Sequence, residues 1–195
     1  LKHFIAYGIP EGGHNGARTI MGQRQLFTDF LPPFKRAVQQ GVGTIMTSYN
    51  ATDGVPSTAN KYLLTDVLRG QWGFDGFVYS DLYSIEAMTK QSVATNPKMA
   101  AVKAIRAGLD MDLGGAAFAT LKESLAEGTV SEADIDRAVK NVLRLKFRLG
   151  LFENPYVAPE QAKKLVRSAE HKALAREVAR QGTILLKNDG VLPLS

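Results

Sequence analysis

The feature of this sequence that most constrains its fold is the alternation of short, β-rich runs with helical stretches across residues 1–115. Predicted strands cover residues 42–49, 76–80 and 109–113, and predicted helices cover 23–40, 58–69, 84–90 and 98–107. Strands that are separated by about 10–20 helical residues pair in parallel through βαβ units rather than as hairpins. We therefore expect an α/β fold, either an open doubly wound sheet or a (β/α)₈ barrel.

Prolines and glycines mark where these helices begin and end. Pro32-Pro33 interrupts the first helix at a point where a second can begin, because proline suits the first turn of a helix. Gly70 and Gly108 are expected to end the helices that precede them.

Beyond Gly114-Gly115 the pattern becomes mainly helical. Helices are predicted over 116–127, over 131–149 with Ser131 as the N-cap, and over 159–181, and a strand is predicted over 183–187. The proline-rich stretch 154–159 between the second and third of these helices reads as an exit from a domain. The expected organisation is a domain over 1–152, a linker over 153–170 and the beginning of another domain over 171–195.

Composition narrows the class of protein. The chain has 195 residues, of which 45% are hydrophobic and 22% charged, so disorder is not expected. It contains no apolar run near the roughly 20 residues that span a bilayer, which argues against a membrane-spanning protein. The absence of cysteine excludes a disulfide scaffold, a thiolate nucleophile and a zinc–thiolate site, but leaves the cellular compartment open. Because the chain begins with Leu1 rather than Met, we expect it to be a piece of a longer protein.

The net charge of +5 is spread along the chain and gives little indication of a partner. The densest basic cluster lies at helical spacing and comprises Arg137, Lys140, Arg144 and Arg148. A complementary apolar stripe comprises Ile135, Ala138, Val142, Leu145 and Leu149, so we expect the basic side chains to form a solvated helix face. Nucleic acid is not an expected partner. No cofactor is expected, since no glycine-rich phosphate-binding pattern occurs and the histidines are too widely spaced for a metal site.

Polar residues follow the predicted strands at the edge where parallel α/β folds build their active sites. The sharpest candidate is Asp81, which can act as a nucleophile or base, or can cap the helix that begins near Ser84. Asp110 and Asp112 share a predicted strand two residues apart and are expected to face the same way. For Asp110, hydrogen bonds to neighbouring backbone amides are the favoured role.

Other candidates carry weaker signals. Lys2 and His3 can reach a pocket near a strand end, or can serve as a surface residue beside a packed one. Tyr49 and Asn50 can hydrogen-bond a sugar, or can merely close a turn. Glu86 is expected to lie on a helix surface or to tether a loop.

Several ordered motifs carry a resemblance to a known family. The run Ile45–Asp81 resembles glycoside hydrolase family 3, the β-glucosidase-like family, over nearly its whole length. The supporting motifs are Lys2-His3-Phe4, Tyr7-Gly8, Glu11-Gly12-Gly13, Ala107-Gly108-Leu109-Asp110-Met111-Asp112, Arg137 with Leu149-Gly150-Leu151-Phe152, Ile184-Leu185-Leu186-Lys187-Asn188 and Leu192-Pro193-Leu194. Together they occur in the family's order and cover almost the entire chain.

The resemblance implies a fold and an activity. Residues 1–152 would be the C-terminal part of a (β/α)₈ barrel, and 171–195 would begin an α/β sandwich domain. The parent protein would be a retaining, exo-acting β-glucosidase that removes terminal β-D-glucosyl residues from oligosaccharides or aryl and alkyl glucosides, in the periplasm or outside the cell. The alternatives are a β-xylosidase, another β-glycosidase of the family, or a non-catalytic sugar-binding relative.

The resemblance also implies roles for individual residues. Asp81 would be the catalytic nucleophile, and Lys2 and His3 would hold sugar hydroxyls. Tyr49 would lie close to the nucleophile, and Met46 would line the same pocket. The acid/base carboxylate would come from outside this chain, so the isolated chain is expected to be inactive. Leu82 stands where many members carry tryptophan, which leaves the sugar specificity open.

Overall fold

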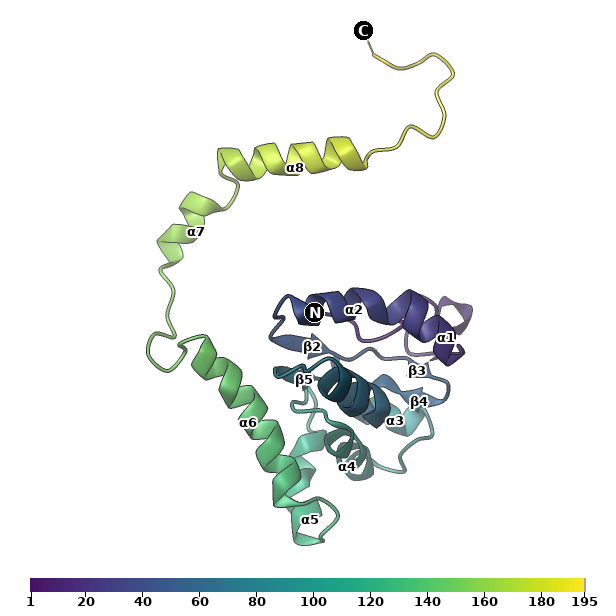
Figure 1. Ribbon diagram of the computed structural model, residues 1–195, viewed down its shortest axis with the longest axis vertical. Coiled ribbons are helices and arrows are strands. Elements are labelled where there is room, and N and C mark those ends of the chain that lie inside the picture. The colour runs from purple at the N-terminus through teal and green to yellow at the C-terminus, as the bar shows by residue number, and fades with distance from the viewer. Residues whose placement is uncertain (195) are drawn as a thin grey trace. The chain divides into compact units, whose positions relative to one another are not determined.

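The computed structural model describes residues 1–194 and divides into two compact units, Leu1–Phe152 and Glu153–Ser195 (Figure 1). The first unit combines helices with short parallel strands, which confirms the predicted α/β class.

Four chain segments lie side by side in the first unit, in the order in which they occur in the sequence. Strand β2 (Thr44–Met46) pairs in parallel with β5 (Phe77–Tyr79), with Ile45 opposite Val78. On the two flanks of this pair, Phe4 forms a parallel bridge with Thr47 and Met111 forms one with Tyr79. The predicted parallel pairing is confirmed, although the ladders are shorter than expected and the run 109–113 contributes only a single bridge.

A second sheet, made of three strands of two residues each, was not predicted. Strand β1 (Arg18–Thr19) pairs in parallel with β3 (Ala51–Thr52), which pairs antiparallel with β4 (Val55–Pro56). The two-residue turn Asp53-Gly54 has φ values of 49° and 84°, the left-handed backbone that a tight hairpin turn requires. The expectation that hairpins are absent was therefore wrong at this position.

The first unit contains short 3₁₀ and π helices in addition to α-helices. They are 3₁₀ helix η1 (Glu11–Gly13), α1 (Gln23–Gln25), π-helix η2 (Leu26–Phe30), α2 (Leu31–Gln39), 3₁₀ helix η3 (Ser57–Ala59), π-helix η4 (Tyr62–Gln71), α3 (Ser84–Lys90), α4 (Pro97–Ala107), 3₁₀ helix η5 (Ala117–Thr120), α5 (Leu121–Ala126) and α6 (Glu132–Arg148). Pro32-Pro33 lies in the first turn of α2, and Gly108, with φ 108°, ends α4 as predicted. Gly70 does not end its helix, because η4 continues to Gln71 and the left-handed residue is Gly73.

One apolar cluster joins the sheet to the helices that surround it. Its largest fully buried side chains are Phe4, Ile5, Leu31, Ile45, Leu63, Leu64, Val67, Leu68, Ile85, Met88, Ile105 and Leu109. Each of these aliphatic and aromatic side chains stabilises the fold by roughly 1.5–3 kcal/mol through removal from water. The cluster therefore holds the parallel segments, and the loops at their ends, in a fixed arrangement.

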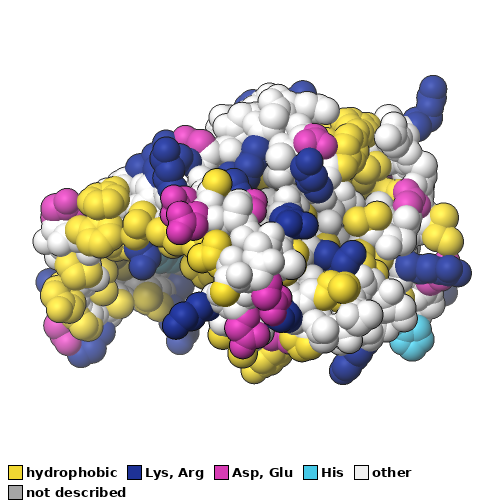
Figure 2. Space-filling model, turned by 90° about the horizontal axis from the view of Figure 1, so that it is seen from below, with side chains coloured by type: hydrophobic (Ala, Val, Ile, Leu, Met, Phe, Trp, Pro, Cys, Tyr) yellow, Lys and Arg dark blue, Asp and Glu magenta, His cyan; other side chains and the backbone are white. Residues whose placement is uncertain are grey.

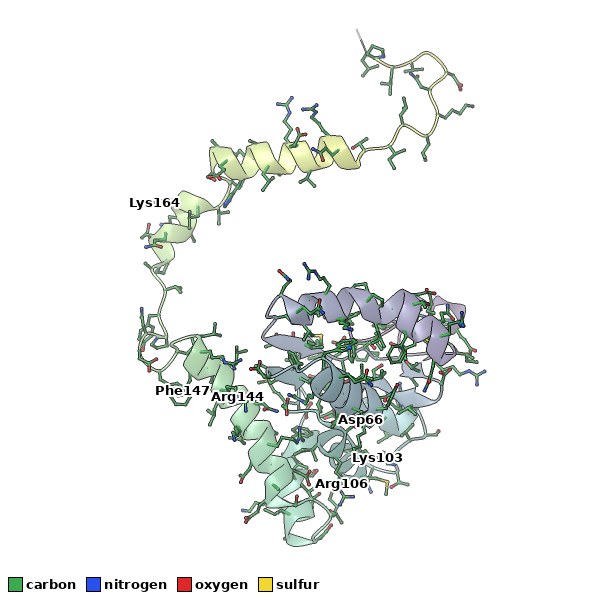
Figure 3. All side chains as sticks on the ribbon, viewed as in Figure 1. Asp66, Lys103, Arg106, Arg144, Phe147 and Lys164 are labelled. Carbon is green, nitrogen blue, oxygen red and sulfur yellow. The ribbon has the colours of Figure 1, made fainter. Side chains whose placement is uncertain are left out.

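Helix α6 begins with the capping box that its sequence predicts, since the side chain of Ser131 accepts a hydrogen bond from the backbone N–H of Asp134. The expectation of a solvated basic face was wrong for Arg137 and Arg144, which are partly buried, whereas Lys140 and Arg148 are exposed. Arg137 donates to Asp110 Oδ1 at 3.0 Å, and Arg144, labelled in Figure 3, donates to the backbone carbonyl of Asp75 at 2.8 Å. These guanidinium groups attach α6 to the segment before β5 and to the segment after α4.

The second unit contains helices α7 (Pro159–Leu165) and α8 (Ala169–Gly182). The single helix predicted over 159–181 is broken, because Arg167 has φ 59° and Ser168 caps α8 by accepting a hydrogen bond from the N–H of His171 at 3.3 Å. The strand predicted over 183–187 is absent from the described chain, since a strand requires a hydrogen-bonded neighbour. Within residues 1–194, no helix is both long and apolar enough to cross a membrane.

Candidate active site

Three of the predicted site residues meet at the carboxyl edge of the parallel segments. Asp81 lies two residues beyond β5, Tyr49 lies three residues beyond β2, and His3 directly precedes the bridge residue Phe4. The His3 Nε2 atom lies 3.6 Å from Asp81 Oδ2. The Tyr49 hydroxyl donates to the backbone carbonyl of Leu82 at 2.6 Å. The register of the strands therefore gathers an imidazole, a phenol and a carboxylate at one edge.

The structure excludes the helix-cap role, one of the two roles that the sequence left open for Asp81. Helix α3 has Tyr83 as its N-cap, and no side chain caps it. Asp81 Oδ1 instead accepts the N–H of the adjacent Leu82 at 2.7 Å, while Oδ2 lies toward His3. The side chain is only 13% exposed. Asp81 is thus not a helix cap, and its Oδ2 atom is directed at His3.

The negative charge of Asp81 affects the pKa values of two nearby tyrosines. Burial raises the pKa of Tyr49, and the neighbouring Asp81 carboxylate raises that pKa further. The same two causes raise the pKa of Tyr7. Both phenols therefore remain protonated at neutral pH, and Tyr49 and Tyr7 donate their protons to the carbonyl of Leu82 and to Asn15 Oδ1, respectively.

Tyr7 stands in one of the motifs that carry the family resemblance, but sequence reasoning gave it no role at the site. Its ring centroid lies 4.9 Å from that of His3 and 6.2 Å from that of Tyr49. The signal that could have identified it is its place in the loop that follows the first parallel segment, since such loops surround the active site in parallel α/β folds.

The remaining predicted residues differ in their surroundings. Met46 is the last residue of β2 and is buried, with 8% of its surface exposed. Lys2 is exposed, and in the part of the chain that is described its ammonium group makes no recorded ion pair or hydrogen bond. Asn50 is fully buried and donates to the carbonyl of Ile5 at 3.1 Å and to the hydroxyl of Thr19 at 3.0 Å. Asn50 therefore serves the fold rather than a ligand.

Asp110 and Asp112 do not face the same way, contrary to the sequence expectation. The segment 109–113 forms only one bridge, so its side chains do not follow the strict alternation of a strand. Asp112 accepts hydrogen bonds from the hydroxyl of Ser80 at 3.4 Å and from the N–H of Phe118 at 3.3 Å. Asp110 accepts the N–H of Val78 at 2.8 Å, as favoured from the sequence.

The carboxylate of Asp110 also forms the centre of a buried ionic network. It pairs with Arg69 and Arg137, and it accepts a hydrogen bond from Asn141 Nδ2 at 3.0 Å. Burial raises the pKa of Asp110, an effect that the two guanidinium groups oppose. This network is attached to β5 through Val78 and thereby supports the strand that leads to Asp81.

Glu86 tethers a loop, which is one of the two roles expected for it. Its Oε1 atom accepts the N–H groups of Ala116 and Ala117 at 2.9 and 3.2 Å, whereas Oε2 is buried without a hydrogen-bond partner. Burial raises the pKa of Asp112, and the negative charge of Glu86 raises it further.

A hollow of about 310 Å³ lies between β4 and α4, lined by Val55 and Lys61 together with Lys103 and Arg106, the two that Figure 3 labels. Asp81 does not line it. On the face shown in Figure 2, Lys and Arg side chains are spread among acidic and apolar ones. Across residues 1–194, no group of three or more His, Asp or Glu side chains is placed to hold a metal ion.

Comparisons with known proteins point to one family. The family model described as the glycosyl hydrolase family 3 N terminal domain matches residues 1–145. A periplasmic beta-glucosidase of Salmonella typhimurium is 38% identical over 96% of this chain, and a putative beta-xylosidase of Formosa agariphila is 42% identical over all of it. The chain spans 25% and 26% of the length of these two relatives.

Solved structures agree with the sequence relatives. The crystal structure of a beta-glucosidase from Listeria innocua in complex with glucose superposes with a TM-score of 0.93 at 38% identity. The match covers 100% of this chain and 27% of the Listeria chain. The relatives thus include enzymes named for glucosides and for xylosides.

Proposed function

The chain belongs to glycosyl hydrolase family 3, and from that membership we propose that its parent protein is a retaining, exo-acting β-glucosidase with Asp81 as the nucleophile. The observation that carries the proposal is the position of the Asp81 carboxylate, at the carboxyl edge of the parallel segments and 3.6 Å from His3. An oxygen of that carboxylate is held by the backbone of Leu82, which fixes its direction.

The proposed reaction is a double displacement. A carboxylate oxygen of Asp81 attacks the anomeric carbon, the glycosidic C–O bond breaks, and the leaving oxygen takes a proton from an acid group. Water, deprotonated by the same group, then cleaves the glycosyl–aspartate ester and releases the sugar. The substrate class is a β-linked oligosaccharide or an aryl or alkyl glucoside.

The acid/base group is assigned to a part of the parent protein outside this chain. Retaining glycosidases place their two carboxyl groups about 5–5.5 Å apart. Glu86 is committed to the backbone amides of Ala116 and Ala117, which argues against a catalytic role for it. The isolated chain is therefore expected to be inactive.

The other predicted residues bind the sugar in this proposal. Lys2 and His3 hold hydroxyl groups, Tyr49 lies beside the nucleophile, and Met46 lines the pocket. The ammonium of Lys2, which makes no hydrogen bond within the described residues, supplies donors, and the Tyr49 hydroxyl oxygen, whose proton goes to the carbonyl of Leu82, can accept a hydrogen bond; both suit a substrate rich in hydroxyl groups. Hydrogen bonds that strengthen as positive charge develops on the sugar ring would accelerate the attack.

We also propose the domain organisation that the resemblance implies. Residues 1–152 form the C-terminal part of a (β/α)₈ barrel, 153–170 form a linker, and 171–195 begin an α/β sandwich domain. The sequential order of the four parallel segments supports a barrel, because neighbours in the chain are neighbours in its sheet. The name of the Salmonella relative supports a periplasmic or secreted location.

The proposal is tested in the full-length parent protein with aryl β-glucosides and a 2-fluoro glucoside. Asp81→Ala should abolish turnover and covalent labelling, while the matched control Asp66→Ala, on the exposed face of η4, should retain both (Figure 3). Activity that survives in Asp81→Ala would show that another residue is the nucleophile.

A β-xylosidase is the second candidate, because the Formosa relative is the more nearly identical of the two reported above. Initial rates on matched aryl β-glucosides and β-xylosides separate the two. A kcat/KM at least as high on the xyloside would replace the glucosidase assignment.

A further inference from the structure

We propose that Tyr7 is a positioning residue, which sets the imidazole of His3 against the carboxylate of Asp81. The inference rests on the proposed function, in which His3 holds a sugar hydroxyl beside the nucleophile. It adds a residue that does not itself carry out chemistry but determines where His3 lies.

The ring of Tyr7 packs against the ring of His3. The Tyr7 ring lies 4.9 Å from it at an interplanar angle of 54°, within the range of favourable aromatic contacts. On its other flank Tyr7 lies 6.2 Å from the ring of Tyr49. Tyr7 therefore stands between the two aromatic side chains that border Asp81.

Few polar contacts hold the side chain of His3 in place. Within the described residues, the side chain of His3 makes one polar contact, in which Nε2 lies 3.6 Å from Asp81 Oδ2. That separation exceeds the usual length of a hydrogen bond. The orientation of the imidazole consequently depends on what packs against it, and Tyr7 provides a flat surface there.

Tyr7 is itself held in place by a hydrogen bond. Its hydroxyl donates to Asn15 Oδ1, in the loop between η1 and β1. That loop is closed by an ion pair between Glu11 and Arg18 at 2.7 Å. Strand β1 then continues the loop into the small sheet, where Arg18 lies opposite Ala51.

A further contact joins this loop to the site. The side-chain amide of Gln91 donates to the carbonyl of Gly16 at 3.4 Å and to the carbonyl of Tyr49 at 2.8 Å. The loop that holds Tyr7 is thus fixed to the segment that carries Tyr49, independently of His3. Tyr7 can therefore transmit the position of this frame to the imidazole.

The test is a double-mutant cycle in the full-length parent protein, with kcat and KM measured on an aryl β-glucoside. Tyr7→Leu, which removes the flat ring, should lower kcat/KM by roughly tenfold to a hundredfold, as small misplacements of a site group do. Tyr7→Phe retains the ring but loses the hydrogen bond to Asn15, so it should show a smaller, severalfold loss. The control Tyr156→Leu changes a tyrosine that is 84% exposed in the second unit and should leave the kinetics unchanged.

The decisive measurement repeats Tyr7→Leu in a His3→Ala background. If Tyr7 acts through His3, Tyr7→Leu should lower kcat/KM little further in the His3→Ala background. If Tyr7 acts independently, the two losses in kcat/KM, expressed as free energies, should add. An additive loss would overturn the proposal, and so would unchanged kinetics in Tyr7→Leu. Thermal unfolding of each variant shows whether the fold is intact.

If Tyr7→Leu fails to fold, Asn15→Ala carries the same test from an exposed position. It frees the Tyr7 hydroxyl and should lower kcat/KM severalfold in the presence of His3 but not in its absence. The same kcat/KM as wild type would overturn the proposal. Failure of the proposed function is seen separately, as turnover that persists in Asp81→Ala.

Discussion

The buried network around Asp110 yields a quantitative prediction for the variant Asp110→Ala. The Asp110 side chain has no exposed surface, and it accepts hydrogen bonds from Val78 N, Arg137 and Asn141 at 2.8, 3.0 and 3.0 Å in addition to its pair with Arg69. Removing one partner of a buried ion pair typically costs about 3–5 kcal/mol, because the other partner is left charged and unpaired. Here two guanidinium groups lose their partner together.

The expected effect is a large fall in thermal stability. For a unit of this size, each kcal/mol corresponds to about 2–4 °C in Tm, so the loss should be about 6–20 °C. The matched control is Asp75→Ala, whose carboxylate pairs with Arg148 at the surface and should change Tm very little. Both are measured by circular dichroism at one pH and one protein concentration.

A fall of less than about 2 °C for Asp110→Ala would refute this reasoning. Such a result would mean that water or another acceptor reaches Arg69 and Arg137 once the carboxylate is removed. The variant Asp110→Asn then locates the cause, because it retains an acceptor for Val78 N–H but removes the negative charge.

Three further predictions concern the backbone, the pH dependence and a helix cap. Gly76→Ala should destabilise the protein by about 1–3 kcal/mol or more, because its Cβ would lie 2.0 Å from the carbonyl oxygen of Gly43, whereas Gly8→Ala meets nothing within 4 Å and should be neutral in urea unfolding. The raised folded-state pKa of Asp112 means that the folded protein holds this proton more tightly than the unfolded chain does. Wild-type stability should therefore fall relative to Asp112→Asn as pH rises above about 4 through that pKa, and parallel denaturation curves that keep a constant difference would contradict the prediction. Ser131→Ala should cost about 0.5–2 kcal/mol by removing the N-cap of α6, and an unchanged denaturation midpoint would argue against it.

The elements that the sequence predicted well are those whose signals are local. The start of α6 follows from Ser131 and Asp134, three residues apart, and the end of α4 follows from Gly108. The position of Asp81 follows from its place directly after an apolar run. In each case the residues that determine the structure are also the residues that display the pattern.

The elements that sequence reasoning missed depend on partners far away in the chain. The periodicity of α6 shows which side chains share a face, but not that Arg137 meets Asp110. The apolar run 183–187 has the composition of a strand, yet it has no hydrogen-bonded neighbour in the described chain. The candidate site follows the same rule, because Tyr7, which packs beside His3, is hydrogen-bonded to Asn15 in a loop that Gln91 contacts.

The sequential pairing of the parallel segments has a consequence for folding during synthesis. Each pairing, from Phe4 with Thr47 to Tyr79 with Met111, closes a loop of about 30–45 residues, so the closure entropies are nearly equal. A ribosome adds that many residues in about 2–9 s, whereas loop closure takes far less than a second. The sheet can therefore grow by one edge segment at a time, in the direction of translation. The candidate site at the carboxyl edge is assembled in the same order, with His3 first, Tyr49 second and Asp81 last.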